Sequence, residues 1–254
     1  MMGSDEGEAM SRRTAVVTGA SAGIGEATAR ALAAAGYEVV VGARRTERLQ
    51  AIAEEIGARA LELDVRDEAS VERFATAAGA AEVLVNNAGL SRGLDPVART
   101  LSEHWIEMYE TNVLGAMRVA RAFIPRLVES GNGHLVNVGS TAGFEVYPGG
   151  AGYTASKHGL RALTRTLRLE LLGEPVRVTE VSPGLVETEF SQVRFDGDAE
   201  RARAVYAGMR PLTAADVAEC VVWVLARPAH VNIDEIVVRP RDQASVAHIH
   251  RRHD

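Results

Sequence analysis

Short apolar runs alternate with amphipathic stretches from residue 13 to about residue 240. The apolar runs have the length of buried strands, and the stretches between them repeat their apolar positions at helical spacing. The predicted strands are 13–19, 38–43, 58–63, 82–86, 134–140, 175–181 and 234–238. The predicted helices begin near residues 23 and 153 or span 46–56, 67–78, 101–130 and 214–225. Pro125, Gly131 and Gly133 are expected to close the 101–130 helix.

Strands and helices that alternate in this order form βαβ units, whose right-handed crossovers place helices on both faces of a parallel sheet. The pattern therefore predicts an α/β fold of the Rossmann type, a doubly wound, seven-stranded parallel sheet. Because no internal repeat or linker interrupts it, we expect a single domain over residues 13–254. Residues 1–12 are small and acidic and have no apolar core, so we expect a disordered tail.

The charge balance argues against several classes of partner. The net charge is −6 and the isoelectric point about 5.7, which leaves no basic face for nucleic acid. No apolar stretch reaches the length of a membrane span, and the N-terminus lacks the features of a signal peptide. Cys220 is the single cysteine and forms no CxxC metal motif. We therefore expect a soluble, cytoplasmic protein that acts on small molecules without a metal.

A glycine-rich loop, residues 18–25 with the sequence TGASAGIG, joins the first predicted strand to the first helix. Glycine permits a tight turn and a close approach of the backbone to a phosphate, and a helix that begins near Gly23 directs its free N–H groups at an anion. The surrounding strand, loop, helix and second strand are the context expected of a dinucleotide site. A purely structural turn is the alternative.

Two arginines, Arg44 and Arg45, follow the second predicted strand, where a site for NAD has an acidic residue. An arginine at this place suits the 2′-phosphate of NADP. The pair therefore indicates NADP(H), although either residue could instead be a solvated residue at the start of the next helix.

Polar and small residues also follow the third and fourth predicted strands. The Asp64 carboxylate, next to Val65, could accept a hydrogen bond from the adenine amino group, or it could cap a turn. The tetrapeptide 86–89, NNAG, leaves room for a flat ligand, and its amides can join neighbouring loops.

Tyr153 and Lys157 lie one helical turn apart, which brings their Cβ atoms to about 5–6 Å from each other. A nearby ammonium favours the ionised phenol, so we expect the pKa of Tyr153 to fall from about 10 towards the range of a general acid/base. Ser140 ends a buried strand and can face a ligand at the same edge. Lys157 is the only lysine in a chain with 28 basic residues, and its compact ammonium differs from the planar fork of arginine. A chance surface lysine is the alternative.

Two further segments complete the predicted site. Asn112 lies on the apolar side of the 101–130 helix, so it is either a satisfied core amide or a residue that holds a water near the site. Residues 187–209 break the periodicity and are rich in charged and aromatic side chains, which is typical of a lid or substrate loop.

Together these residues resemble the short-chain dehydrogenase/reductase family over residues 13–240. The matching motifs are the loop 18–25, the tetrapeptide 86–89, Asn112, Ser140, Tyr153, Lys157 and residues 183–188. The resemblance implies that Tyr153 is the general acid/base, that Ser140 polarises the substrate oxygen, and that Lys157 holds the nicotinamide ribose. It also implies that Asn112 holds a water in a proton relay. The predicted catalytic residues are Asn112, Ser140, Tyr153 and Lys157. The predicted cofactor residues are Gly19, Ser21, Gly23, Ile24, Gly25, Arg44, Arg45, Asp64, Val65, Asn86, Ala88, Gly89, Tyr153, Lys157, Pro183, Gly184, Val186 and Thr188.

The segments 137–143, 183–186, 188–195 and 228–233 are similar to the NADP-dependent 3-hydroxy acid (serine) dehydrogenases. This similarity implies oxidation of short 3-hydroxy acids, or reduction of the corresponding carbonyl compounds, in a tetramer built on the helices of Asn112 and Tyr153. A carboxylate substrate favours a bidentate cation, and Arg194 is the candidate, with Ser140 as the second substrate contact. A salt bridge from Arg194 to Asp196 or Glu189 is the alternative.

Two rival functions stay open. A ketoreductase or aldehyde reductase of a larger secondary metabolite would use the same catalytic residues with a different lid. A non-catalytic regulator that binds NADPH would use the same fold without the reaction, because a fold alone does not determine function.

Overall fold

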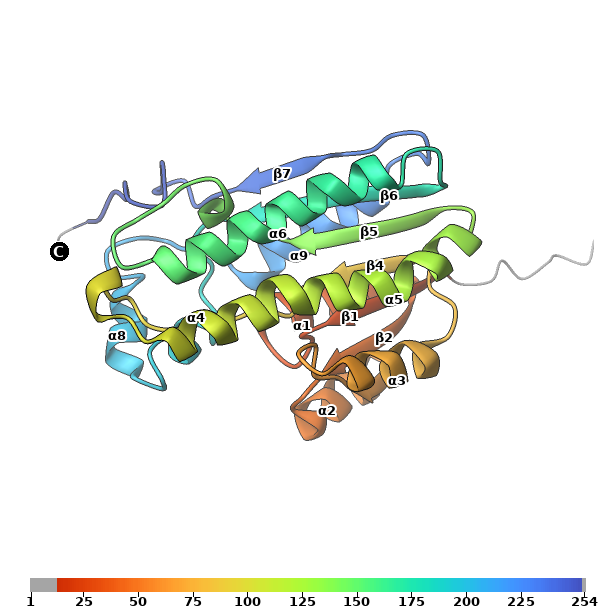
Figure 1. The fold of residues 1–254 in the computed structure, drawn as a ribbon, viewed down its shortest axis with the longest axis horizontal. Helices are drawn as coiled ribbons and strands as arrows, with labels where there is room; N and C mark the ends of the chain where they lie inside the picture. The colour runs from red at the N-terminus through yellow and green to blue at the C-terminus, as the bar shows by residue number, and fades with distance from the viewer. Residues whose placement is uncertain (1–12, 253–254) are drawn as a thin grey trace, which may run out of the picture.

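The computed structural model describes residues 13–252, so the predicted tail at 1–12 lies outside the described part of the chain. Its centre is a parallel sheet of seven strands in the order β3-β2-β1-β4-β5-β6-β7 (Figure 1). The strands are β1 (Thr14–Thr18), β2 (Glu38–Ala43), β3 (Arg59–Glu62), β4 (Val83–Asn86), β5 (Gly133–Val138), β6 (Val176–Pro183) and β7 (Glu235–Val238). The predicted doubly wound sheet is confirmed.

Two apolar cores lie on opposite faces of the sheet, because successive residues of a strand point to opposite sides. Val17 belongs to one core and Val16 to the other, and both are fully buried. The first core is covered by α1 (Gly23–Ala34), α2 (Thr46–Ile56) and α9 (Ala214–Leu225). The second is covered by α3 (Glu68–Ala78), α5 (Ala116–Glu129) and α6 (Ala151–Glu170). In Figure 1, α5 and α6 cross the near face of the sheet and α1 and α9 lie behind it.

The predicted 101–130 helix is one continuous helical segment with an irregular centre. It consists of α4 (Ser102–Tyr109), a π-helical stretch η2 (Glu110–Gly115) and α5. The expectation that Pro125 helps to close this helix is wrong, because α5 continues past it to Glu129. Phe123 and Leu127, which flank Pro125, are fully buried against the sheet, so packing holds the helix together where one backbone hydrogen bond is missing.

The strand order reverses between β1 and β4. In an open parallel sheet, such a reversal makes the two neighbouring crossover helices diverge to opposite faces and leaves a crevice at the carboxyl ends of the strands. The fold therefore directs the ends of β1, β4 and β5 at a common cleft. Within residues 13–252, the helices are too short or too polar to cross a bilayer.

Candidate active site

A cleft of about 930 Å³ lies at the carboxyl edge of the sheet. This volume falls within the range of about 300–1,000 Å³ that is usual for ligand sites. Its walls come from the loops after β1 to β6 and from the segment 187–209, here called the lid. The lid contains two short helices, α7 (Phe190–Arg194) and α8 (Ala199–Ala204), which explains its broken periodicity. Of the predicted site residues, the cleft brings together Gly19, Ser21, Gly23, Ile24, Arg44, Arg45, Asp64, Val65, Ala88, Gly89, Ser140, Tyr153, Lys157, Pro183, Gly184, Val186, Thr188 and Arg194.

The glycine-rich loop has the geometry of an anion site. Gly19 and Gly23 have φ angles of 66° and 58°, which glycine adopts without strain. The N-cap of α1 is Ala22, and no side chain of residues 13–252 caps the helix there. The first N–H groups of α1 are therefore free to bind a ligand phosphate in the cleft.

Two predicted cofactor residues, Gly25 and Asn86, do not line the cleft. Gly25 is buried at the start of α1, where an added Cβ would overlap the carbonyl oxygen of Gly19. It therefore acts on the loop through packing. The Asn86 amide donates to the Ala116 oxygen at 2.8 Å and joins β4 to α5.

Asn87, whose side chain the cofactor prediction missed, performs the loop-joining role that was expected of this tetrapeptide. Its amide donates to the oxygens of Thr18 and Gly19 at 2.9 and 3.3 Å, and it lines the cleft. Asn86 and Asn87 are neighbours, and only the tertiary structure distinguishes the one that faces the cleft.

The arginines after β2 differ in their surroundings. Arg45 donates to Ser21 Oγ at 3.1 Å and pairs with Glu189 of the lid at 2.8 Å. Arg48, one turn on, pairs with the same carboxylate at 2.7 Å. The exposed Arg44 guanidinium makes no hydrogen bond or ion pair with another residue of the described range 13–252. Arg44 is therefore a cation available to an anionic ligand at the carboxyl end of β2.

Asp64 forms the turn that was one of its two predicted roles, and its hydrogen bond to adenine stays a prediction. It lines the cleft, and its carboxylate also accepts from the backbone N–H of Arg66 at 3.0 Å, which closes a turn. The Arg66 guanidinium binds both carboxylate oxygens and lowers the pKa of Asp64. An adenine amino group would share this carboxylate with Arg66.

The segment 183–188 forms part of the wall of the cleft. Pro183 is the last residue of β6, and Val186 pairs with Leu212 in an isolated parallel bridge. The Thr188 side chain packs against Gly23, where an added Cβ would lie 3.3 Å from it. The start of the lid is thus held against the glycine-rich loop.

Ser140, Tyr153 and Lys157 meet at the base of the cleft. Ser140 follows β5, and its Oγ accepts from the Ala142 N–H at 3.1 Å, which leaves the hydroxyl proton free to donate. Tyr153 is the third residue of α6, which begins at Ala151. Lys157 is buried on the same helix, and its Nζ donates to the Val138 oxygen at 2.9 Å. The alternative that Lys157 is a chance surface residue is therefore wrong.

The sequence predicted that Lys157 lowers the pKa of Tyr153, but in the structure this pKa is raised. Burial raises the pKa of Tyr153, and the opposing influences are the Arg194 charge and hydrogen bonding to Ser140. Burial also lowers the pKa of Lys157 to about 8, against a favourable charge interaction with Glu180. Desolvation therefore outweighs the pairing of charges that the spacing suggested.

Asn112 lies in the π-helical stretch and is buried. Its Oδ1 accepts from the Leu90 N–H at 2.8 Å, and its Nδ2 donates to the Leu90 oxygen and to Ser156 Oγ at 2.8 and 2.9 Å. Of the two predicted roles, the structure therefore shows the satisfied core amide. A water-holding role for this residue stays a prediction.

Arg194 projects from α7 to the catalytic residues. Its guanidinium carbon lies 5.2 Å from the Tyr153 ring centroid, and it donates to Ser91 Oγ at 3.0 Å and to the Tyr147 hydroxyl at 3.2 Å. The alternative salt bridges are wrong, because Glu189 pairs with Arg45 and Arg48, and Asp196 pairs with Arg92. Within residues 13–252, no carboxylate pairs with Arg194.

Several lining residues were not predicted. Tyr147 and Arg92 come from loops before α6 and after β4, and the C-terminal residues Gln243, Val246 and Ile249 close one side. Tyr147 precedes Pro148 and two glycines next to the Tyr153 helix, which is a local signal that could have marked it. The C-terminal segment carries no comparable motif.

Comparison with known proteins agrees with this geometry. The sequence pattern of the family described as short chain dehydrogenase matches residues 13–199. An uncharacterized oxidoreductase of Mycobacterium tuberculosis is 61% identical over 236 residues, which are 93% of this chain and 94% of that protein. The NADP-dependent 3-hydroxy acid dehydrogenase of Salmonella typhimurium is 44% identical over 236 residues, which are 90% of this chain and 95% of that protein.

A solved structure of the closed form of serine dehydrogenase complexed with NADP+ has a TM-score of 0.89 at 41% identity. The match covers 94% of this chain and 100% of that one. The matches in sequence and in fold extend over nearly the whole described chain. The chain therefore belongs to the short-chain dehydrogenase family of oxidoreductases.

Proposed function

We propose that this protein uses NADP(H) to interconvert a short 3-hydroxy acid and the corresponding 3-oxo acid. The observation that carries the substrate class is Arg194, a guanidinium in the cleft beside Tyr153 with no carboxylate partner among the described residues. A partly buried arginine fork binds a carboxylate in a bidentate manner. The similarity to 3-hydroxy acid and serine dehydrogenases supports the same class.

The residues of the cleft fit the dinucleotide. The uncapped α1 N-terminus and the glycines at positive φ suit a pyrophosphate, and Arg44 suits a 2′-phosphate. When bound, the nicotinamide supplies the hydride acceptor in oxidation and the hydride donor in reduction. Everything else in the reaction is the movement of one proton and the orientation of the substrate.

In the oxidative direction, the Tyr153 phenolate accepts the proton of the substrate alcohol as the C–H hydride leaves. The hydroxyl of Ser140 donates a hydrogen bond to the same oxygen. In the reductive direction, the Tyr153 phenol returns the proton to the developing alkoxide. The positive charge of Arg194 favours the phenolate over the phenol. With its carboxylate bound to Arg194, a 3-hydroxy acid would have its β-carbon, which carries the reacting hydroxyl, within reach of Tyr153.

The cofactor proposal predicts a specific role for Arg44. Replacing Arg44 with alanine should raise the Kd for NADPH about 10- to 100-fold, the range for loss of a charged hydrogen bond, and change the Kd for NADH little. Nicotinamide fluorescence titration measures both constants. Arg48→Ala is the matched control, because Arg48 is exposed but already paired with Glu189. Equal loss of NADPH and NADH binding in Arg44→Ala would contradict the assignment.

The substrate proposal is tested by following NADP+ reduction with alcohols that differ in charge. L-Serine, 3-hydroxypropionate and 3-hydroxyisobutyrate should be used, and the neutral 3-hydroxypropionamide should be used poorly. Arg194→Met should lower kcat/KM for the acids about 100-fold more than for the amide, because only the acids lose a charged partner. The variant keeps an unbranched side chain but loses the hydrogen bonds to Ser91 and Tyr147, so the ratio of acid to amide activity is the readout.

Three results would point elsewhere. Turnover of bulky neutral ketones alone would favour a reductase of larger secondary metabolites. Tight NADPH binding without turnover of any alcohol would favour the regulator. Arg194→Met with an unchanged ratio of acid to amide activity would remove Arg194 from the substrate site.

A cytoplasmic tetramer built on α4–α5 and α6 stays a prediction, supported by the exposed apolar side chains of Ile106 and Tyr109 on α4.

A further inference from the structure

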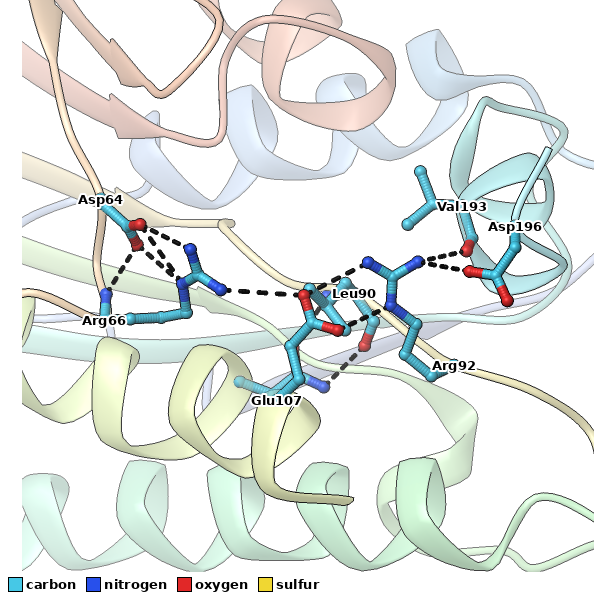
Figure 2. A network of polar contacts seen from close by, with 8 residues as sticks. Asp64, Arg66, Leu90, Arg92, Glu107, Val193 and Asp196 are labelled. Carbon is cyan, nitrogen blue, oxygen red and sulfur yellow. Dashed lines mark hydrogen bonds and ion pairs between the residues drawn. The ribbon is translucent and has the colours of Figure 1, made fainter. Parts of the chain in front are cut away.

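A row of four charged side chains runs from the end of β3 to the end of α7 (Figure 2). It begins at Asp64 and Arg66, continues through Glu107 of α4 and ends at Arg92, which reaches the lid. None of the roles derived above for the cofactor or the reaction uses Arg92 or Glu107. Their side chains are only 23% and 24% exposed, so this pair is better shielded than an ordinary surface ion pair.

Arg92 holds the point at which α7 ends. Its Nη1 donates to the Val193 oxygen at 2.9 Å and to Asp196 Oδ1 at 3.0 Å. The N–H of the next residue, Gly93, donates to the Arg194 oxygen at 2.9 Å. Asp196 has a φ of 50°, a left-handed conformation that few residues other than glycine adopt. The carbonyl groups of Val193 and Arg194 and the side chain of Asp196 are therefore tied to residues 92 and 93.

Glu107 fixes the direction of the Arg92 guanidinium. Its carboxylate accepts from Arg92 Nε at 2.7 Å and from Nη2 at 3.2 Å, which is the bidentate geometry of a strong arginine pair. Arg66 Nη1 lies 3.8 Å from Glu107 Oε1, the oxygen that also accepts from Arg92 Nη2. With Nε and Nη2 bound to α4, only Nη1 remains to reach the lid. The pair thus acts as a bracket between α4 and α7.

The loop that carries Arg92 is itself held at the catalytic end. The Asn112 amide binds both backbone groups of Leu90, and Ser91 Oγ accepts from Arg194 Nε at 3.0 Å. Four consecutive residues, 90–93, therefore connect a buried amide of the catalytic set to the guanidinium in the cleft. A shift of this loop would move Arg194 relative to Tyr153.

We propose that Arg92, oriented by Glu107, is a positioning residue that holds the end of α7 so that the Arg194 guanidinium meets the substrate carboxylate. This inference rests on the proposed function for the nature of the substrate. Arg92 does not touch the reacting atoms; it acts through Arg194.

The bracket is tested with Arg92→Gln and with Glu107→Gln as a second, milder variant. Arg92→Gln should raise KM for 3-hydroxypropionate about 10- to 30-fold through loss of charged hydrogen bonds, with kcat changed much less. The Kd for NADPH and the KM for 3-hydroxypropionamide should stay within about twofold of the parent values. Glu107→Gln should change the same constants in the same direction by a smaller factor, because the amide that replaces the carboxylate still presents one acceptor oxygen.

A double-mutant cycle separates positioning from an independent role. If Arg92 acts through Arg194, adding Arg92→Gln to Arg194→Met should cause little further loss with 3-hydroxypropionate. Losses that multiply in the double variant would overturn the proposal. So would an equal loss of acid and amide turnover in Arg92→Gln, because that pattern indicates general damage to the lid.

Arg13→Gln is the matched control for the loss of an ion pair. Arg13 also pairs with a glutamate, Glu82, at 2.7 Å, and their side chains are 31% and 33% exposed. That pair lies beside the start of β4, at the opposite edge of the sheet from the cleft. Arg13→Gln should leave the ratio of acid to amide activity unchanged.

A readout without substrate distinguishes failure of this inference from failure of the proposed function. Trypsin cleaves after arginine, and mass spectrometry of the NADPH-bound protein can follow cleavage of the Arg194–Phe195 bond. Release of α7 in Arg92→Gln should make this cleavage several times faster than in the parent protein and in Arg13→Gln, because local opening controls proteolysis. Unchanged cleavage in both Arg92→Gln and Glu107→Gln would overturn the bracket, whatever the substrate.

Discussion

Replacing Tyr153 with phenylalanine is expected to lower kcat about 10³-fold, within the range of 10²–10⁴ that general acid/base catalysis supplies. The variant loses the only group that can accept the alcohol proton in the proposed reaction. Its ring would stay in place, because the ring packs edge-on against Phe190 at a centroid distance of 5.5 Å. NADPH binding, measured by fluorescence titration, should therefore be nearly unchanged. Steady-state turnover with the best 3-hydroxy acid gives kcat.

Tyr147→Phe is the matched comparison for this prediction. Tyr147 is a second tyrosine of the cleft, and its hydroxyl binds Arg194 at 3.2 Å. Burial raises the pKa of Tyr147, with Arg194 opposing the shift, much as in Tyr153. Its loss should act on KM through Arg194 and leave kcat within about tenfold of the parent value. If Tyr153→Phe keeps more than a few per cent of turnover, Tyr153 is not the proton carrier.

Substitution of Lys157 should have the second largest effect. Lys157→Arg is expected to lower kcat/KM at least about 100-fold, although it keeps the charge, because a planar guanidinium differs in shape and hydrogen bonding from an ammonium. The Nζ lies in a confined space, 2.9 Å from the Val138 oxygen and next to Gly89, where an added Cβ would be 3.7 Å from it. Near-normal kinetics in Lys157→Arg would contradict a special role for the single lysine.

Lys157→Met should be inactive and yet more stable than the parent protein at pH 7. Burial lowers the pKa of Lys157 from 10.5 to about 8, so the folded protein holds an unfavourable buried cation below pH 8. Removing that cation is worth up to about 3 kcal/mol in the free energy of unfolding, at 1.36 kcal/mol per pKa unit.

The advantage of Lys157→Met should shrink as the pH rises from 8 towards 10.5. In that window the unfolded parent chain binds the proton and the folded one has released it, so the stability of the parent protein increases with pH. Urea unfolding at pH 7 and pH 9.5 measures the change. A variant that is less stable than the parent protein at pH 7 would mean that the hydrogen bond to Val138 outweighs the cost of burial.

The elements that the sequence predicted well are those with local causes. The seven strands and the helices between them follow from apolar periodicity, and the lid at 187–209 follows from its loss. Gly19 and Gly23 were recognisable because their backbone conformations suit glycine. Pro125 misled the prediction because a local rule, that proline ends a helix, was overcome by the burial of Phe123 and Leu127.

The site required information that no single stretch contains. Asn86 and Asn87 are adjacent, and adjacent residues at a strand end point to opposite sides, so the register of β4 decides which one faces the cleft. Arg194 lacks the ion pairs that were its alternative role, because Glu189 pairs with Arg45 and Arg48 and Asp196 pairs with Arg92.

The sequence by itself determined the fold class and the shared helix face of Tyr153 and Lys157, because periodicity and helical spacing are local properties of a chain. Only the tertiary structure decided the electrostatic state of these two side chains. Burial raises the pKa of Tyr153 and lowers the pKa of Lys157, so it disfavours the charged form of both. The folded chain also places Arg194 over the Tyr153 ring. Desolvation depends on every segment that packs around a residue, so it arises only when the chain has folded.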